Sequence, residues 1–138
     1  MENEAALALS PLLVPLLWSV PLLVVHILLQ GVTATKELGT DWNAGPRDDD
    51  RKASGILAGR AERASLNFRE TYPVFIVLAL TLAIMGETAG WAIFGAWLWF
   101  VCRIIYIPLY LAGIPYIRSL VWVGSLIGLL IMFLTALF

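Results

Sequence analysis

The stretch RAERASLNFRETYPVFIVLALTLAIM, residues 60–85, places a row of polar side chains directly before an unbroken apolar run. The row consists of Arg60, Arg63, Asn67 and Glu70. Spacings of three and four residues put all of them on one face of a helix. The apolar run, 74–85, is too short to cross a hydrocarbon layer of about 30 Å. The span must therefore reach back through Glu70 and Asn67, to a depth where an unpaired charge costs several kcal/mol.

The composition is that of a membrane protein. Of 138 residues, 60% are hydrophobic and only 14% are charged, against about a quarter in a soluble domain. The length predicts one domain, 1–138. A net charge of -1 gives no electrostatic reason to expect a nucleic-acid partner. His26 and Cys102 are each alone in the sequence, so we expect no metal site and interpret both as packing residues.

Apolar segments of about 20 residues predict four membrane-spanning helices, at about 7–29, 57–85, 91–110 and 116–138. The first connection, at about 31–55, is long and polar, whereas 86–90 and 111–115 are tight turns. Short turns make consecutive helices pack antiparallel. The predicted fold is therefore all-α, an integral membrane four-helix bundle with up-down topology.

Basic residues lie on one side of this bundle only. They surround the first connection and flank the third, and they are Lys36, Arg47, Arg51, Lys52, Arg60, Arg63 and Arg118. Positively charged residues favour the cytoplasmic side of a membrane. We therefore expect the first and third connections to be cytoplasmic and both termini to be periplasmic.

A second polar stripe lies on the third predicted helix. Arg103, Tyr106 and Tyr110 follow one another at spacings of three and four residues, so they share a face. Counting about 1.5 Å per residue from the second connection places Glu70 and Arg103 within about one helical turn of each other in depth. We therefore expect an intramembrane ion pair between them, with Asn67 level with the two tyrosines.

Two interpretations of these stripes fit the sequence. In the structural one, the outer arginines anchor helices at the interface and a Glu70–Arg103 pair holds the bundle together. In the functional one, the stripes line a polar cavity near the cytoplasmic end. Four arginines, at 60, 63, 103 and 118, converge on one acid, and this surplus of positive charge favours an anionic ligand. Whether Arg60 belongs to the site or only anchors its helix stays open.

These motifs resemble those of one family of membrane proteins. The run GRAERASLNFRETYPVF, residues 59–75, is similar to the R-x-x-R-A-x-x-N-x-x-E-x-x-P-x-F signature of the MAPEG family, the membrane-associated proteins of eicosanoid and glutathione metabolism. The run 103–119 is similar to the family's third helix and to the arginine that leads into its fourth. The long first connection, with GPRD at 45–48, looks more like bacterial members.

The resemblance implies a homotrimer that binds glutathione between neighbouring subunits, with the site open to the cytoplasm, in a bacterial inner membrane. Carried onto this sequence, the residues that would bind glutathione are Arg60, Arg63, Asn67, Glu70, Arg103, Tyr106 and Tyr110. The candidates for catalysis, as groups that would stabilise the glutathione thiolate, are Arg118, Tyr110 and Tyr106.

The resemblance predicts a microsomal-type glutathione transferase, with peroxidase activity as a second reaction. Such an enzyme would detoxify apolar electrophiles or lipid hydroperoxides that enter from the membrane lipids. The main alternative is a non-enzymatic lipid-binding or scaffold protein of the same fold. A small four-span exporter is a third interpretation, which the absence of an acid from the first span disfavours.

Overall fold

The computed structural model describes residues 10–138, and all regular structure within them is helical. The long helices are α2 (Leu13–Leu38), α4 (Ile56–Ile84), α5 (Gly90–Leu111) and α6 (Ile117–Leu137), and the short helix α3 (Thr40–Ala44) follows α2. Each long helix has the length and hydropathy needed to cross a membrane. The chain is thus an integral membrane protein, and the predicted four-helix bundle is confirmed.

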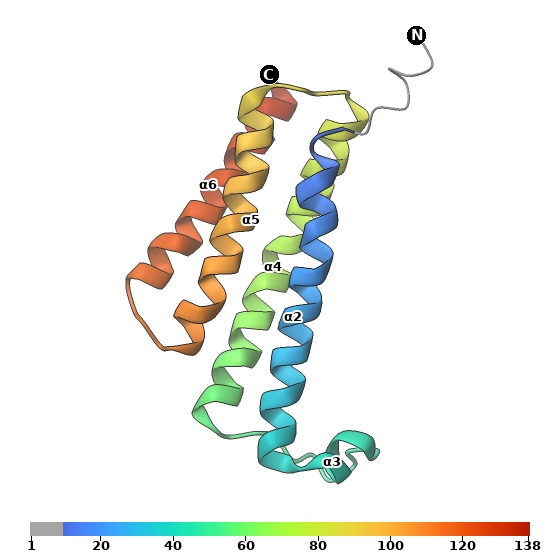
Figure 1. Ribbon diagram of the computed structural model, residues 1–138, viewed down its shortest axis with the longest axis vertical. Coiled ribbons are helices and arrows are strands. Elements are labelled where there is room, and N and C mark those ends of the chain that lie inside the picture. Colours follow the sequence, from blue (N-terminus) through green and yellow to red (C-terminus); the bar gives the residue numbers. More distant parts are fainter. Residues whose placement is uncertain (1–9) are drawn as a thin grey trace.

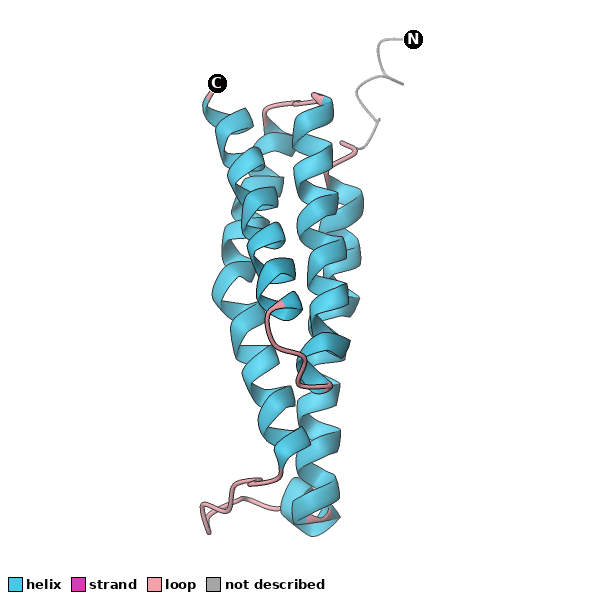
Figure 2. Ribbon diagram, turned by 90° about the vertical axis from the view of Figure 1, so that its left-hand side faces the viewer, coloured by secondary structure: helices cyan, strands magenta, loops and turns pink. Residues whose placement is uncertain are grey.

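The long helices run alternately up and down the molecule (Figure 1). The start of α2 and the end of α6 lie at one end of the bundle, and α3 lies at the other (Figures 1 and 2). The turn between α5 and α6 faces the same end as α3 but does not reach as far along the long axis. The first turn of α4 therefore projects past the α5–α6 turn.

Helix α2 extends further than the sequence predicts. A connection is expected from residue 31, but the helix continues to Leu38 and ends at Gly39, whose φ of 94° suits glycine. The added segment is polar but contains no proline, and the Thr33 and Thr35 hydroxyls donate to carbonyls of the preceding turn. Hydropathy shows where a helix leaves the apolar layer, not where it ends. The expected start of this span, at Leu7, lies outside the described residues.

The far end of α2 is tied to the start of α4. The Glu37 carboxylate accepts hydrogen bonds from the backbone N–H groups of Ser54 and Gly55, at 2.7 and 2.9 Å. It also accepts one from the Ser54 hydroxyl, at 2.9 Å. Backbone donors at a helix start lack helical partners, and a negative charge is favourable there. The two ends of the first connection are thereby fixed to each other.

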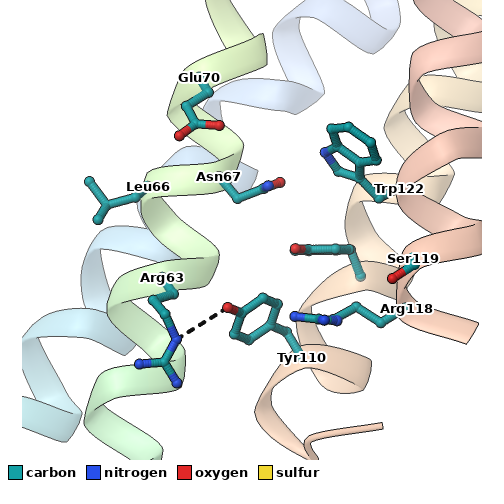
Figure 3. A pocket seen from close by; sticks show the side chains of 9 residues that line it. Arg63, Leu66, Asn67, Glu70, Tyr110, Arg118, Ser119 and Trp122 are labelled. Carbon is teal, nitrogen blue, oxygen red and sulfur yellow. Dashed lines mark hydrogen bonds between the residues drawn. The ribbon is translucent and has the colours of Figure 1, made fainter. Parts of the chain in front are cut away.

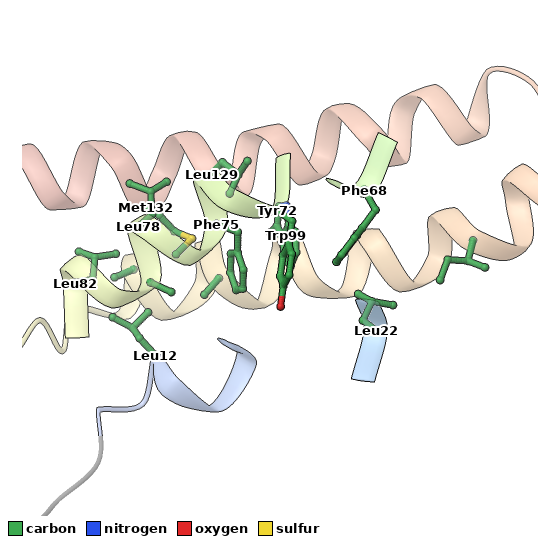
Figure 4. Packing of buried hydrophobic residues seen from close by; sticks show 14 residues of the cluster. Leu12, Leu22, Phe68, Tyr72, Phe75, Leu78, Leu82, Trp99, Leu129 and Met132 are labelled. Carbon is green, nitrogen blue, oxygen red and sulfur yellow. The ribbon is translucent and has the colours of Figure 1, made fainter. Parts of the chain in front are cut away.

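Trp99 of α5 lies at the centre of an aromatic core (Figure 4). Its ring stacks on Phe75 of α4, with centroids 3.9 Å apart, and lies 6.0 Å from the ring of Tyr72. The Tyr72 hydroxyl shares a hydrogen bond of 2.9 Å with the hydroxyl of Ser19 on α2. This cluster joins α2, α4 and α5, so the position of α4 is fixed one turn beyond its polar row.

Helices α5 and α6 approach closely at two glycines. A Cβ added to Gly128 would lie 2.6 Å from the carbonyl oxygen of Gly95 and 2.8 Å from the backbone nitrogen of Trp99. Small residues at a crossing let helix backbones come together inside a membrane. Helix α6 is thus packed tightly on α5, and space for a cavity is left between α6 and α4.

Candidate functional site

A polar cavity of about 460 Å³ opens between α4, α5 and α6 (Figure 3). Helix α4 forms one wall, and α6 with the end of α5 forms the other. The lining residues are Arg63, Leu66, Asn67, Glu70, Tyr106, Tyr110, Arg118, Ser119 and Trp122. The structure therefore brings six of the predicted site residues together, from three helices.

The α4 wall follows from the helical period. Arg63, Asn67 and Glu70 line the cavity, while Ala64 and Phe68, from another face of the helix, are buried in the bundle. Small and aromatic residues on the buried face hold α4 against its neighbours. The polar row is consequently held at the edge of the core, where it is open to a ligand.

Tyr110 contacts two arginines of the cavity. Its hydroxyl accepts a hydrogen bond of 3.2 Å from Nε of Arg63, and Cζ of Arg118 lies 4.6 Å from its ring centroid. Within residues 10–138, the one ion pair joins Arg51 to Asp49, so no acid pairs with the cavity arginines. Most guanidinium donors of Arg63 and Arg118 are therefore free to bind a carboxylate or another anion.

Arg103 supports the cavity wall from behind. Its side chain is 0% exposed and does not line the cavity. Its Nη1 donates a hydrogen bond of 2.8 Å to Oδ1 of Asn67, and its Cζ lies 4.5 Å from the Tyr106 ring centroid. Arg103 therefore positions two lining residues, whereas the sequence predicts direct contact with the ligand.

The expected ion pair between Glu70 and Arg103 is absent from the described part of the chain. Arg103 points to Asn67, and Glu70 is exposed on an adjoining face of α4. Depth counting gives the position of a residue along a helix but not its direction around the helix axis. Glu70 consequently has no cationic partner among the described residues.

Arg60 lies at the outer end of the site. Its Nη1 donates a hydrogen bond of 3.1 Å to the carbonyl oxygen of Leu111, at the end of α5, where carbonyls lack helical partners. A smaller cavity of about 250 Å³ lies here, and its lining includes Arg60, Arg63 and Arg118. Arg60 thus holds the α5–α6 turn and also adds positive charge at the mouth of the main cavity.

Sequence reasoning misses three lining residues, which are Leu66, Ser119 and Trp122. Helical spacing gives a signal for two of them, since Leu66 precedes Glu70 by four residues and Trp122 follows Arg118 by four. Trp122 lies across the cavity from Asn67 (Figure 3), and its Nε1 has no hydrogen-bond partner in the described part of the chain. This buried donor is therefore left unsatisfied by the described part of the chain.

An apolar groove of about 520 Å³ continues along the same side of the bundle. It lies between α4 and α6 and is lined by Pro73, Val74, Val77, Leu78, Leu129, Leu130 and Phe133. Pro73 follows Glu70 by about one helical turn, so the groove begins where the polar cavity ends. A polar and an apolar ligand can therefore lie next to each other.

His26 and Cys102 lie outside the cavity lining. His26 is buried in the bundle and stacks on Phe68, with ring centroids 4.7 Å apart. Cys102 is a half-buried free thiol that faces Gly124 of α6. Both side chains pack between helices and contribute no group to the cavity.

The comparison with known families gives one match. The MAPEG family model covers residues 15–138, nearly the whole chain, and this range contains every residue that lines the cavity. No curated protein and no solved structure matches the chain. The chain therefore belongs to the MAPEG family, whose members are membrane proteins associated with glutathione-dependent transferase and peroxidase activity.

Proposed function

We propose that this protein is a membrane-bound, glutathione-dependent transferase and peroxidase that acts on apolar electrophiles and lipid hydroperoxides. The observation that carries the proposal is the polar cavity, which has two arginines without acidic partners and opens beside an apolar groove. Membership of the MAPEG family favours glutathione as the anionic ligand of this cavity. The volume of the cavity is within the usual range for a small ligand, about 300–1,000 Å³.

Glutathione carries two carboxylates, one ammonium group and one thiol, and the cavity offers a partner for each. Arg60 and Arg63, at the mouth, would bind carboxylates, because a guanidinium matches a carboxylate with two parallel hydrogen bonds. Glu70 would accept from the ammonium group. Asn67, held by Arg103, would bind the peptide backbone.

Arg118 is the residue that we assign to the thiol. A free thiol has a pKa of about 8.5, and the thiolate is the nucleophile. Lowering that pKa by about two units requires roughly 2.7 kcal/mol of preferential stabilisation of the anion. The Arg118 guanidinium lies against the Tyr110 ring, so its donors are directed by packing. The hydroxyls of Tyr106 and Tyr110 would add hydrogen bonds to the sulfur.

Two reactions follow from a thiolate placed beside an apolar groove. In conjugation, the sulfur attacks the electrophilic carbon, a carbon–sulfur bond forms, and the leaving group departs with the electron pair of its bond. In peroxide reduction, the sulfur attacks the terminal oxygen, the O–O bond breaks, and the products are a sulfenic acid and an alkoxide. The alkoxide takes up the proton that the thiol released, giving the alcohol. A second glutathione converts the sulfenic acid to the disulfide and water. In both cases the apolar substrate would reach the sulfur from the groove between Pro73 and Phe133.

We further propose that the protein is a homotrimer in a bacterial inner membrane, with glutathione bound between neighbouring subunits and the site open to the cytoplasm. One observation supports shared sites. Leu66 and Glu70 line the cavity and are nevertheless exposed, so a single chain leaves the cavity open along α4. A neighbouring copy would close that side.

The test is a titration of the purified protein with glutathione, followed by ultraviolet absorbance of the thiolate. We expect a thiolate signal with the wild-type protein and none with Arg118→Leu, while calorimetry still detects binding. Arg51→Leu, which removes an exposed arginine far from the cavity, is the matched control and should behave as wild type. A wild-type protein that does not bind glutathione would overturn the proposal.

A second candidate function has support from the apolar groove, which has a volume of about 520 Å³ and contains no charged residue. In this alternative the protein binds a lipid without chemistry. The two functions are separated by assays with a chromogenic electrophile and with a lipid hydroperoxide. Glutathione binding without a thiolate signal and without turnover would favour the lipid-binding alternative.

A further inference from the structure

A second apolar groove, of about 550 Å³, lies on the exposed side of α2. Helix α2 packs into the bundle through a row of buried residues that includes Leu22 and His26. The groove is formed by another part of its surface together with the short helix α3, which lies beside the end of α2 (Figure 1). Neither helix contributes to the polar cavity, so the glutathione chemistry proposed above does not account for this groove.

The half of the groove nearer the middle of α2 is apolar. Ile27, Leu28 and Val32 line it, and each of these side chains is more than half exposed. Gly31 lies among them, and a Cβ placed on it would meet no atom within 4 Å, so the helix surface is recessed at this point. Apolar side chains around a recessed backbone offer contact area to a hydrocarbon chain, because many weak attractions between close carbon atoms add up.

The other half of the groove is polar. Thr35 and Lys36 line it from α2, and Thr40 and Asn43 line it from α3. The chain turns at Gly39, whose φ is 94°, and this turn brings the two residues of α3 next to the last turn of α2. Hydroxyl and amide groups beside a cation can donate hydrogen bonds to the oxygens of a phosphate or a glycerol.

Lys36 is the one charged residue that lines this groove. No acid within residues 10–138 pairs with it, and the carboxylate of its neighbour Glu37 already accepts three hydrogen bonds from the start of α4. Behind the polar half, Nη2 of Arg47 donates a hydrogen bond of 2.9 Å to Oδ1 of Asn43, whereas Asp41, the acid of α3, does not line the groove. This end of the groove therefore favours an anionic group.

The two halves lie at the depths that the two parts of a phospholipid occupy. Lys36 is about 35 Å from the start of α2 at Leu13, which places it beyond a hydrocarbon layer of about 30 Å and level with the headgroups. Ile27 lies about 14 Å from Lys36 along the helix, close to the thickness of about 15 Å of hydrocarbon in one leaflet. One lipid molecule can therefore span the groove from its polar to its apolar end.

We propose that this groove binds one anionic phospholipid, with its phosphate beside Lys36 and one acyl chain over Gly31. A basic residue near a membrane surface favours anionic lipids about fivefold, whereas a zwitterionic headgroup brings its own cation to the same place. The site differs from the groove between α4 and α6, which contains no charged residue and so offers no means of selecting a headgroup. Because α2 and α3 both contribute, the bound lipid joins a spanning helix to the first connection.

Headgroup selection is tested by native mass spectrometry. The protein in mild detergent is mixed with equal amounts of phosphatidylglycerol and phosphatidylcholine that carry the same acyl chains. We expect wild type to retain phosphatidylglycerol about fivefold more often. Lys36→Gln should remove this preference and Lys36→Arg should keep it, while Gly31→Leu, which fills the recess, should lower retention of phosphatidylglycerol. Lys52→Gln, the same charge change at an exposed loop residue outside the groove, should behave as wild type.

The occupant is identified with the photocrosslinking variant Leu28→p-benzoylphenylalanine in nanodiscs of equal phosphatidylglycerol and phosphatidylcholine. We expect mainly phosphatidylglycerol adducts, and about fivefold fewer of them when Lys36→Gln is added. The same crosslinker at Val20, which is exposed on α2 outside the groove, should show no headgroup preference. Equal retention of the two lipids by wild type, an unchanged preference in Lys36→Gln, or a crosslink from Leu28 to a second copy of the chain would each overturn the proposal.

Discussion

Tyr110 contacts the two cavity arginines through different parts of its side chain, so its roles can be separated. Tyr110→Phe removes the hydroxyl that Arg63 donates to and keeps the ring beneath Arg118. A lost hydrogen bond costs about 0.5–1.5 kcal/mol, so we expect glutathione to bind about two- to tenfold more weakly. Tyr110→Leu also removes the cation–π contact and should weaken binding further. Calorimetric titration measures both, and equal affinities of the two variants would contradict a role for the ring.

Arg103 and Asn67 should act as a unit. Asn67→Leu leaves the fully buried guanidinium without the one acceptor that the described chain gives it. A hydrogen bond to a charged group contributes about 1.5–3 kcal/mol, so we expect a clear loss of thermal stability. The double variant Asn67→Leu/Arg103→Leu should lose less than the sum of the two single variants, because neither group is then left unpaired. Additive losses would show that the two side chains are independent.

At the scale of helices, the close approach of α5 and α6 predicts different tolerance at different glycines. Gly128→Ala puts a methyl group 2.6 Å from the carbonyl oxygen of Gly95, so we expect a destabilisation of about 1–3 kcal/mol. Gly31→Ala, inside α2, meets no atom within 4 Å and is the matched control. It should be neutral or slightly stabilising, because alanine favours helix over glycine. The unfolding midpoints of the two variants are compared in detergent. Equal midpoints would show that the close approach of α5 and α6 at Gly128 does not contribute to stability.

The helices themselves are largely predictable from the sequence, because a membrane span is defined by one property, apolar length. The extension of α2 to Leu38 could not be predicted, because that segment lies beyond the apolar layer, where hydropathy does not indicate a helix. The contacts between side chains of different helices could not be predicted from the sequence either. Glu70 and Arg103 lie at similar depths, but the direction of each side chain around its helix axis decides which residues meet. In the structure Arg103 donates its hydrogen bond to Asn67 and not to Glu70.

At the scale of the whole molecule, the up-down arrangement makes a prediction about sidedness. In a Cys102→Ala background, Thr88→Cys lies in the connection at the end shared with the start of α2 and the C-terminus, and Asp49→Cys lies in the connection at the α3 end. If positive charge sets orientation, an impermeant maleimide should label Thr88→Cys in intact cells. It should label Asp49→Cys only after the membrane is opened. The reverse pattern would place the cavity mouth outside the cytoplasm.

The cavity could be predicted only as a set of residues. The spacing and charge of the residues predict the polar stripes on α4 and α5, because the period of a helix can be recognised from the sequence alone. The contribution of α6 depends on how tightly Gly95 and Gly128 bring it onto α5 and how far that leaves it from α4. That distance is a property of the packed bundle, so Ser119 is identified only in three dimensions, whereas its spacing from Arg118 gives a signal for Trp122.

The tie between Glu37 and the start of α4 makes the first connection a tolerant site for inserted sequence. Its two ends are held together by three hydrogen bonds, whatever chain lies between them. The entropy of closing a loop grows only slowly with its length. An epitope or a fluorescent domain placed at Asp48–Asp50, which are exposed, should leave α2 and α4 undisturbed. The protein thus provides an attachment point for a reporter at the end of the molecule opposite the start of α2 and the C-terminus.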